Sequence, residues 1–148
     1  KAIGTLSKNK IGALIAIERE VGLDNFIETG TRLNADVTSE LICTVFWPGS
    51  PLHDGAAIIQ EQKMIAAGCL LPLTENMELS KSLGTRHRAG IGLTEETDAI
   101  VIIVSEETGA ISTGFKGALN RDIDEKGLEK ILDELSTERF GIARSQHA

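Results

Sequence analysis

The sequence predicts a single α/β domain in which helices cover a mixed central β-sheet. The chain has 148 residues, which is the length of one domain. Its composition, 41% hydrophobic and 25% charged, is ordinary for a folded globular protein. Short apolar runs typical of strands and longer segments with helical spacing follow one another without strict alternation. We therefore expect one domain over residues 1–148, with a mixed rather than a purely parallel sheet.

Apolar runs predict the strands. They lie at residues 11–17, 56–59, 64–67, 99–104 and 110–115. The run at 11–17 is continuously apolar, as in a strand buried on both faces. The polar residues 60–63 predict a hairpin between the second and third runs, and residues 106–109 predict a tight turn between the last two.

Apolar residues at helical spacing predict helices over residues 37–46 and 123–135, and residues 85–94 are expected to form a short helix between them. We expect Asp36 or Ser39 to cap the first helix and Pro48-Gly49 to end it. Thr85 is the expected N-cap of the short helix. Residues 22–34 are expected to form a loop with a short strand, residues 74–84 to cross the surface, and residues 137–148 to form a flexible polar tail.

Charge and composition argue against several classes of protein. The net charge is −7, from 22 acidic and 15 basic residues, which disfavours a general nucleic-acid binder. Aromatic residues are only 3% and Tyr is absent, so a base-stacking platform is not expected. No apolar run approaches the ~18 residues of a membrane-spanning helix, so we expect this stretch to be soluble as it stands. It begins at Lys1, without an initiator Met or a signal-peptide pattern, and we expect it to be part of a longer parent chain.

The first segment with candidate chemistry is Pro51-Leu52-His53-Asp54-Gly55-Ala56-Ala57, at the start of a predicted strand. Small residues leave the Asp54 carboxylate beside bare backbone and let a ligand approach the main chain. Such a carboxylate can hold a divalent metal, accept a proton, or both. The alternative is an ordinary Asp-Gly turn that enters a strand.

The second segment is Gly84-Thr85-Arg86-His87-Arg88-Ala89-Gly90. If Thr85 caps a helix, the first free N–H groups of that helix point toward the same place as the two arginines. A helix N-terminus, a hydroxyl and two guanidinium groups together form a polyphosphate site. The alternative is a solvated basic turn that pairs with surface Glu residues. The segment is not a Walker loop.

The third segment, Val104-Ser105-Glu106-Glu107-Thr108-Gly109, closes a turn between two buried strands. Its serine and two acids can contact a phosphate and a metal together, and the alternative is ordinary turn chemistry with solvated acids. Each of the three segments lies at a strand or helix end, where ligands bind in α/β folds.

These segments resemble the diadenylate cyclase domain. The resemblance depends on the Asp54-Gly55-Ala56 and Arg86-His87-Arg88 triplets and on the Ser105-Glu106-Glu107 turn, and it runs from about Ile11 to Leu135. Residues 11–20 and Glu28-Thr29-Gly30 are similar to the membrane-anchored subtype in particular, in which membrane helices precede the catalytic domain. The resemblance implies a parent chain at the cytoplasmic face of the cell membrane.

The resemblance also implies a function. Such domains condense two ATP molecules into cyclic di-AMP and release two pyrophosphates. It implies that Asp54, Arg86 and Arg88 are catalytic, with Asp54 helping to activate the ribose 3′-hydroxyl. The residues implied to bind ATP are Gly55, Ala56, Leu70, Leu71, Thr85, Arg86, His87, Arg88 and Ser105. Some relatives stack a Tyr on the adenine at the position of Leu70, and this chain lacks that contact.

The implied metal ligands are His53, Asp54, Glu106 and Glu107, for Mn²⁺, Mg²⁺ or Co²⁺. One chain offers a site for one nucleotide whereas the product joins two, so a homodimer with facing sites is expected. A nucleic-acid partner is not expected. The alternatives are a sensing module that binds ATP or a dinucleotide without turnover, and an RNA-binding module that uses residues 86–88.

Overall fold

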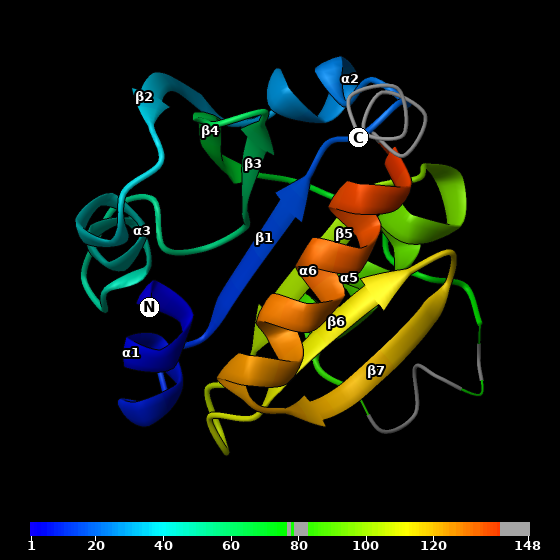
Figure 1. Cartoon of the computed structure of the whole chain (residues 1–148). Coiled ribbons are helices and arrows are strands. Elements are labelled where there is room, and N and C mark those ends of the chain that lie inside the picture. Colours follow the sequence, from blue (N-terminus) through cyan, green and yellow to red (C-terminus); the bar gives the residue numbers. More distant parts are fainter. Residues whose placement is uncertain (77, 79–82, 140–148) are drawn as a thin grey trace, which may run out of the picture.

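The five apolar runs and two more polar strands form one seven-stranded sheet in the computed structural model of the chain, which describes residues 1–76, 78 and 83–139 (Figure 1). The strand order across the sheet is β2 (Thr31–Asp36), β4 (Lys63–Cys69), β3 (Ala56–Gln60), β1 (Ala13–Ile17), β5 (Ile100–Val104), β6 (Ile111–Phe115) and β7 (Ala118–Ile123). Strands β1 and β3 run parallel, and every other neighbouring pair of these strands is antiparallel. The predicted mixed sheet is confirmed, as are the hairpin β3–β4 and the turn between β5 and β6.

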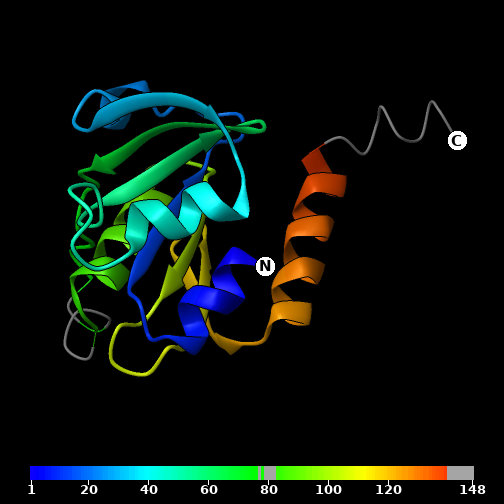
Figure 2. The same ribbon diagram turned by 90° about the vertical axis from the view of Figure 1, so that its left-hand side faces the viewer.

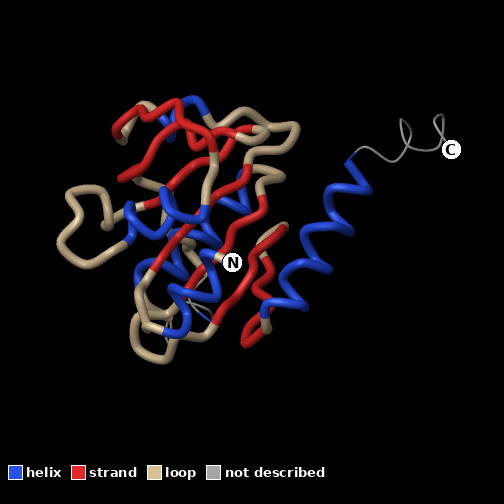
Figure 3. The backbone as a smooth tube through the Cα atoms, turned by 60° about the vertical axis from the view of Figure 1, so that its left-hand side comes forward, coloured by secondary structure: helices blue, strands red, loops and turns tan. Residues whose placement is uncertain are grey.

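Helices cover both faces of this sheet, and the core is divided accordingly. On one face lie α1 (Ala2–Lys8), α3 (Ser39–Phe46) and α6 (Glu125–Arg139), and on the other lie α2 (Asp24–Ile27) and α5 (Thr85–Glu96). Figure 2 shows α1, α3 and α6 on the same side of the strands, and Figure 3 shows the helices in blue beside the red strands. Successive residues of β1 alternate between the two core clusters: Ala13 and Ile15 pack with α1 and α3, and Leu14 and Ala16 pack with α5. The expectation that this strand is buried on both faces is confirmed.

Small residues bring α5 unusually close to the sheet. A Cβ atom added at Gly90 would lie 2.9 Å from Cδ1 of Ile103 and 3.3 Å from Cδ1 of Leu14. On the other side of the helix, a Cβ at Gly92 would collide with the backbone of Pro72. This close packing holds the N-terminus of α5 at one edge of the sheet.

Both predicted helix caps are wrong by one or two residues. Helix α3 is capped by Thr38, whose Oγ1 accepts a hydrogen bond from the backbone N–H of Leu41 at 3.0 Å. Asp36 is instead the last residue of β2, and its carboxylate lies 2.6 Å from Nζ of Lys63. The N-cap of α5 is Gly84, in an extended conformation, so Thr85 is the first helical residue.

Three short elements were not predicted from the sequence: the brief helices α1 and α2 and the edge strand β7, whose residues are exposed or only partly buried. The short strand expected within residues 22–34 is found as β2, Thr31–Asp36. Helix α6 continues to Arg139, into the segment expected to be a tail, and residues 140–148 lie outside the described part. Residues 77 and 79–82 of the expected surface crossing also lie outside it. Among the described residues, no helix has the length and hydropathy needed to span a membrane.

The Thr38 cap generates a stability prediction. Thr38→Ala leaves the N–H of Leu41 without its acceptor and is expected to lower the free energy of unfolding by about 1 kcal/mol. Thr44→Ala is the matched control, because the Thr44 hydroxyl bonds to the carbonyl of Glu40 inside the same helix and Ala is a better helix former. Urea denaturation of both variants measures the difference. Equal destabilisation by the two substitutions would contradict the assigned cap.

Candidate functional site

Strand register brings two of the three sequence segments to one edge of the sheet. Ile15 of β1 is level with Ala57 of the parallel strand β3, so the residues before these strands, Gly12 and the Asp54-Gly55 pair, share an edge. Ala13 is level with Val104 at the end of antiparallel β5, so Ser105 follows at that edge. Gly12 therefore lies between the Asp54 turn and the turn that begins at Ser105.

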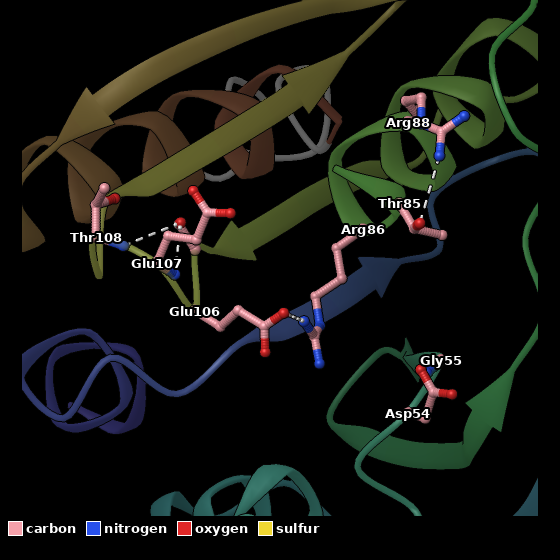
Figure 4. Close-up of polar contacts among 9 residues, drawn as sticks. Asp54, Gly55, Thr85, Arg86, Arg88, Glu106, Glu107 and Thr108 are labelled. Carbon is pink, nitrogen blue, oxygen red and sulfur yellow. Dashed lines mark hydrogen bonds and ion pairs between the residues drawn. The ribbon is translucent and has the colours of Figure 1, made fainter. Parts of the chain in front are cut away.

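The third segment reaches this edge through the side chain of Arg86. A Cβ atom added at Gly12 would lie 2.5 Å from Nη1 of Arg86, so the guanidinium lies directly against this glycine. Nη1 is also 3.6 Å from Oε1 of Glu106. Figure 4 shows the Arg86 guanidinium between Glu106 on one side and Asp54 on the other. All three segments thus converge on the same region.

A cavity of about 710 Å³ opens beside this arginine. Its volume falls within the range of about 300–1,000 Å³ that is usual for ligand sites. The cavity is lined by Leu83, Gly84, Thr85, Arg86, His87, Val104, Ser105, Glu106, Glu107, Thr108, Ala110, Ser112, Arg121 and Asp122. Residues of the second and third sequence segments therefore line the same cavity.

Helix α5 offers unpaired donors to this cavity. The first N–H bonded within the helix is that of Arg88, which donates to the Gly84 carbonyl at 3.1 Å. The backbone N–H groups of Thr85, Arg86 and His87 precede it, at the positive end of the helix dipole. Among the described residues, the buried Nε–H of Arg86 also has no hydrogen-bond acceptor. Buried donors are normally satisfied, so this wall is suited to an anion.

The Ser105 hydroxyl organises the β5–β6 turn and retains a donor. Its oxygen accepts hydrogen bonds from the N–H groups of Glu107 at 3.2 Å and Thr108 at 3.3 Å. These contacts occupy both lone pairs, so the O–H remains free to donate to a ligand oxygen. The turn is held from α1, where Oγ of Ser7 donates to the Gly109 carbonyl at 2.5 Å.

The Asp54 turn combines an exposed acid with a constrained glycine. Gly55 has φ +91°, and a Cβ there would lie 2.7 Å from the Cys69 carbonyl oxygen, so the fold itself requires this glycine. Nδ1 of His53 lies 2.7 Å from the Ser50 carbonyl. Because a carbonyl only accepts, Nδ1 carries the proton and Nε2 keeps its lone pair for another partner.

His87 is held in its neutral form. Burial lowers the pKa of the His87 imidazole, and the positive charges of Arg121 and Arg86 lower that pKa further. The neutral ring can donate one hydrogen bond to a ligand without adding charge to the wall. Both arginines are close enough to His87 to act on its ionisation.

Several predicted site residues are not gathered with the others. Arg88 turns toward Thr85, with Nη2 3.4 Å from Oγ1, and Figure 4 shows its guanidinium away from that of Arg86. Ala56 is fully buried in β3, so any ligand contact would involve its backbone. Leu70 is 69% exposed. Within the described ranges, the residues predicted from sequence that do not line the cavity are His53, Asp54, Gly55, Ala56, Leu70, Leu71 and Arg88.

The four predicted metal ligands do not form one cluster in a single chain. No group of three His, Cys, Asp or Glu side chains among the described residues is arranged to hold a metal ion. The Arg86 guanidinium occupies the space between Glu106 and Asp54 (Figure 4). A complete all-protein metal cage is therefore not preformed, whereas Asp54 and His53 remain available as an incomplete pair of ligands.

Sequence reasoning missed residues that tertiary structure adds to the site. Gly12 looked like part of a buried strand, although a glycine at the start of a β run is a signal for close approach by another group. Ser112, Arg121 and Asp122 line the cavity from β6 and β7. Strand β7 was not predicted, so no local pattern connected Arg121 with the other arginines.

Comparisons with known proteins match the chain to one family model and to several curated relatives. The family model described as "DAC: DisA bacterial checkpoint controller nucleotide-binding" matches residues 1–119. "Cyclic di-AMP synthase CdaA" of Bacillus subtilis (strain 168) is 50% identical over 133 residues, covering 90% of this chain and 49% of that protein. "Diadenylate cyclase" of Listeria monocytogenes serotype 1/2a (strain 10403S) is 50% identical over 132 residues, covering 89% of this chain and 48% of that protein. The chain therefore spans about half the length of these curated relatives.

Two solved structures are similar to this chain in both fold and sequence. A double mutant (N166C/T172C) of DacA from Staphylococcus aureus superposes with a TM-score of 0.85 at 49% identity, covering 94% of this chain and 90% of that one. A structure from Bacillus cereus, described as a hypothetical membrane spanning protein, gives a TM-score of 0.80 at 47% identity, with 83% and 60% coverage.

The contact between Gly12 and Arg86 leads to a prediction about the site. Gly12→Ala is expected to displace the guanidinium, because the added Cβ would collide with it. The colliding atoms belong to the end of a flexible side chain, so the free energy of unfolding should change by less than about 1 kcal/mol. Loss of this cation should weaken the binding of inorganic pyrophosphate about tenfold, measured by titration calorimetry.

Gly22→Ala is the matched control, since a Cβ at Gly22 has no atom within 4 Å. It should bind pyrophosphate like the parent protein. Unchanged binding by a folded Gly12→Ala protein would show that Arg86 does not need this glycine.

Proposed function

Since the chain belongs to the diadenylate cyclase (DAC) domain family, we propose that it is the catalytic domain of a cyclase that condenses two ATP molecules into cyclic di-AMP. The observation that carries the proposal is the convergence of Asp54, Arg86 and the Ser105–Glu107 turn on one sheet edge beside a cavity of ligand size. These are the groups that joining an α-phosphate to a sugar hydroxyl requires.

The reaction makes modest demands on the protein. The ribose 3′-oxygen of one nucleotide attacks the α-phosphorus of the other, and the bond between that phosphorus and the pyrophosphate oxygen breaks. The leaving oxygen takes the bonding electron pair, and the proton of the 3′-hydroxyl passes to a base. In phosphoryl transfer the protein mainly positions these groups and neutralises charge.

Each converging group has a place in this scheme. The exposed Asp54 carboxylate is the proposed acceptor of the 3′-hydroxyl proton. The Arg86 guanidinium, with the free N–H groups of α5, offsets charge on the phosphates as pyrophosphate leaves. The Ser105 hydroxyl donates to a phosphate oxygen, and the neutral His87 ring supplies one further donor. Gly55, Leu70 and Leu71 are proposed to lie beside the nucleoside.

A divalent cation fits this donor set in one way. Mg²⁺ is often bound by one or two carboxylates together with substrate phosphates rather than by a complete protein cage. Asp54 would hold such an ion, with Nε2 of His53 as a second ligand and Glu106 or Glu107 as further candidates. The ion would supply charge neutralisation at the phosphates. Mn²⁺, Mg²⁺ and Co²⁺ are the candidates.

Two copies of the domain are needed for the product. The cavity beside Arg86 suits one triphosphate, whereas cyclic di-AMP contains two nucleotides. We propose that two chains face each other across a two-fold axis, each presenting one ATP to the other. A lone subunit would bind ATP without turning it over, so any factor that separates the two faces would inhibit.

The proposal extends to the parent protein. The B. subtilis and L. monocytogenes relatives are about twice as long as the matched segment, and the B. cereus structure is described as membrane spanning. We propose that the domain belongs to a membrane-anchored chain and works at the cytoplasmic face. The competing function is a nucleotide-binding module without turnover, because the same groups serve binding and catalysis.

Substitution of the proposed base separates turnover from binding. Asp54→Asn should keep the fold, because Asp54 is exposed, and should abolish cyclic di-AMP. The assay incubates the protein with ATP and Mn²⁺ or Mg²⁺ and resolves the nucleotides by chromatography. Asp133→Asn, an exposed acid on α6, is the charge-matched control and should remain fully active. Full activity in a folded Asp54→Asn protein would count against Asp54 as the acceptor of the 3′-hydroxyl proton. Absence of cyclic di-AMP from the unsubstituted chain would favour a nucleotide-binding module without turnover.

The two arginines are expected to differ in their effects. Arg86→Ala should lower kcat/KM by about 10²-fold or more, by analogy with removal of a charge-stabilising donor. Arg88→Ala should also lower it, but less, because its guanidinium lies beside Thr85 rather than against Gly12. Rates of pyrophosphate release measure both, with Arg32→Ala on the edge strand β2 as the control. Unchanged turnover in Arg86→Ala would remove this residue from the phosphate site.

A further inference from the structure

Arg121 is a cation of the cavity wall that the mechanism above does not use. It lies on β7, which pairs with β6 next to the β5–β6 turn. The register places Ile123 opposite Ile111 and Asn120 opposite Thr113, so Arg121 lies beside Ser112, which also lines the cavity. Arg121 therefore reaches the cavity from an edge strand, whereas the Arg86-His87-Arg88 segment reaches it from helix α5.

Arg121 is a cation with which no acid among the described residues of the cavity wall forms an ion pair. Its positive charge and that of Arg86 both act on the partly buried His87, so His87 lies within electrostatic reach of the two guanidiniums. Glu106 is paired with Arg86, and the other acids of the wall are Glu107 and Asp122. Among the side chains that the structure describes in residues 1–76, 78 and 83–135, no carboxylate lies within ion-pairing distance of Arg121. Its hydrogen-bond donors are therefore available to a ligand.

We propose that Arg121 binds the terminal phosphates of the nucleotide, the part that leaves as pyrophosphate. This inference rests on the proposed function for the identity of the ligand. When the bond to the α-phosphorus breaks, negative charge builds up on the departing pyrophosphate. Arg121 donates to its non-bridging oxygens and stabilises that charge together with Arg86. A nucleoside monophosphate lacks these phosphates and would not reach Arg121.

The test compares ligands with and without the terminal phosphates. Titration calorimetry with inorganic pyrophosphate and with AMP is carried out on the unsubstituted chain and on the variants Arg121→Gln, Arg121→Lys and Arg32→Gln. Arg32 is an exposed arginine on β2, at the opposite edge of the sheet, so its variant carries the same change in net charge. Arg121→Gln should bind pyrophosphate about tenfold more weakly and AMP equally well. The pyrophosphate affinity of Arg121→Lys should lie between those of Arg121→Gln and the unsubstituted chain, because Lys keeps the positive charge and loses the paired donors of the guanidinium.

A second measurement reports on position rather than affinity. In the ligand-free protein, Arg121→Gln removes a positive charge near His87 and should raise the pKa of that imidazole, followed by NMR titration. Bound pyrophosphate should raise the His87 pKa in the unsubstituted chain, and should raise it by less in Arg121→Gln. If the role of Arg121 were purely structural, the rise in the His87 pKa would be the same in both proteins.

The inference is overturned if Arg121→Gln binds pyrophosphate as tightly as the unsubstituted chain, or if the unsubstituted chain does not bind pyrophosphate. It is also overturned if Arg32→Gln loses as much pyrophosphate affinity as Arg121→Gln does. Failure of the proposed function has a different signature. In that case the unsubstituted chain forms no cyclic di-AMP from ATP and metal, while its affinity for pyrophosphate still depends on Arg121.

Discussion

The contact between the Arg86 guanidinium and Gly12 is the interaction on which the site depends. Gly12 lies where the parallel strands β1 and β3 begin and the antiparallel strand β5 ends, so it is the midpoint of an edge shared by the Asp54 and Ser105 turns. The absence of a side chain at Gly12 lets Arg86 cross this edge, and Glu106 holds its other side at 3.6 Å. With Glu106 69% exposed, this ion pair is weak and the guanidinium can exchange its partner for a ligand.

Close packing of small residues produces this arrangement from a distance. Gly90 lets α5 sit directly on Ile103 and Leu14, which sets the position of the N-terminus of the helix and hence of Arg86. Ser7 of α1 holds the β5–β6 turn through the Gly109 carbonyl. Two elements on opposite faces of the sheet therefore position two walls of one cavity, and the groups that contact the ligand are supported by rigid packing.

The strongest strands and the chemical groups of the site were predictable from local sequence. The continuous run 11–17 and the run 99–104 are apolar at every position that a doubly covered strand requires, and both are confirmed. Strand β7 was missed because it is an edge strand with polar residues, which resembles a loop. The cap of α3 was misplaced because Asp36 and Ser39 are as suitable chemically as Thr38. In the structure Asp36 ends β2 opposite Lys63 of β4, and the N–H of Leu41 bonds to Thr38.

By itself, the sequence determined which strands are buried and which residues carry an acid, a pair of guanidiniums and a hydroxyl at the ends of regular elements. These features are local, since burial and turn chemistry are encoded by neighbouring residues. Only the tertiary structure decided that Gly12 accommodates Arg86, that Arg88 turns aside toward Thr85, and that Arg121 joins the wall. Strand order and register bring these residues together from distant parts of the chain, and such long-range pairing depends on how two covered sheet faces pack rather than on any single segment.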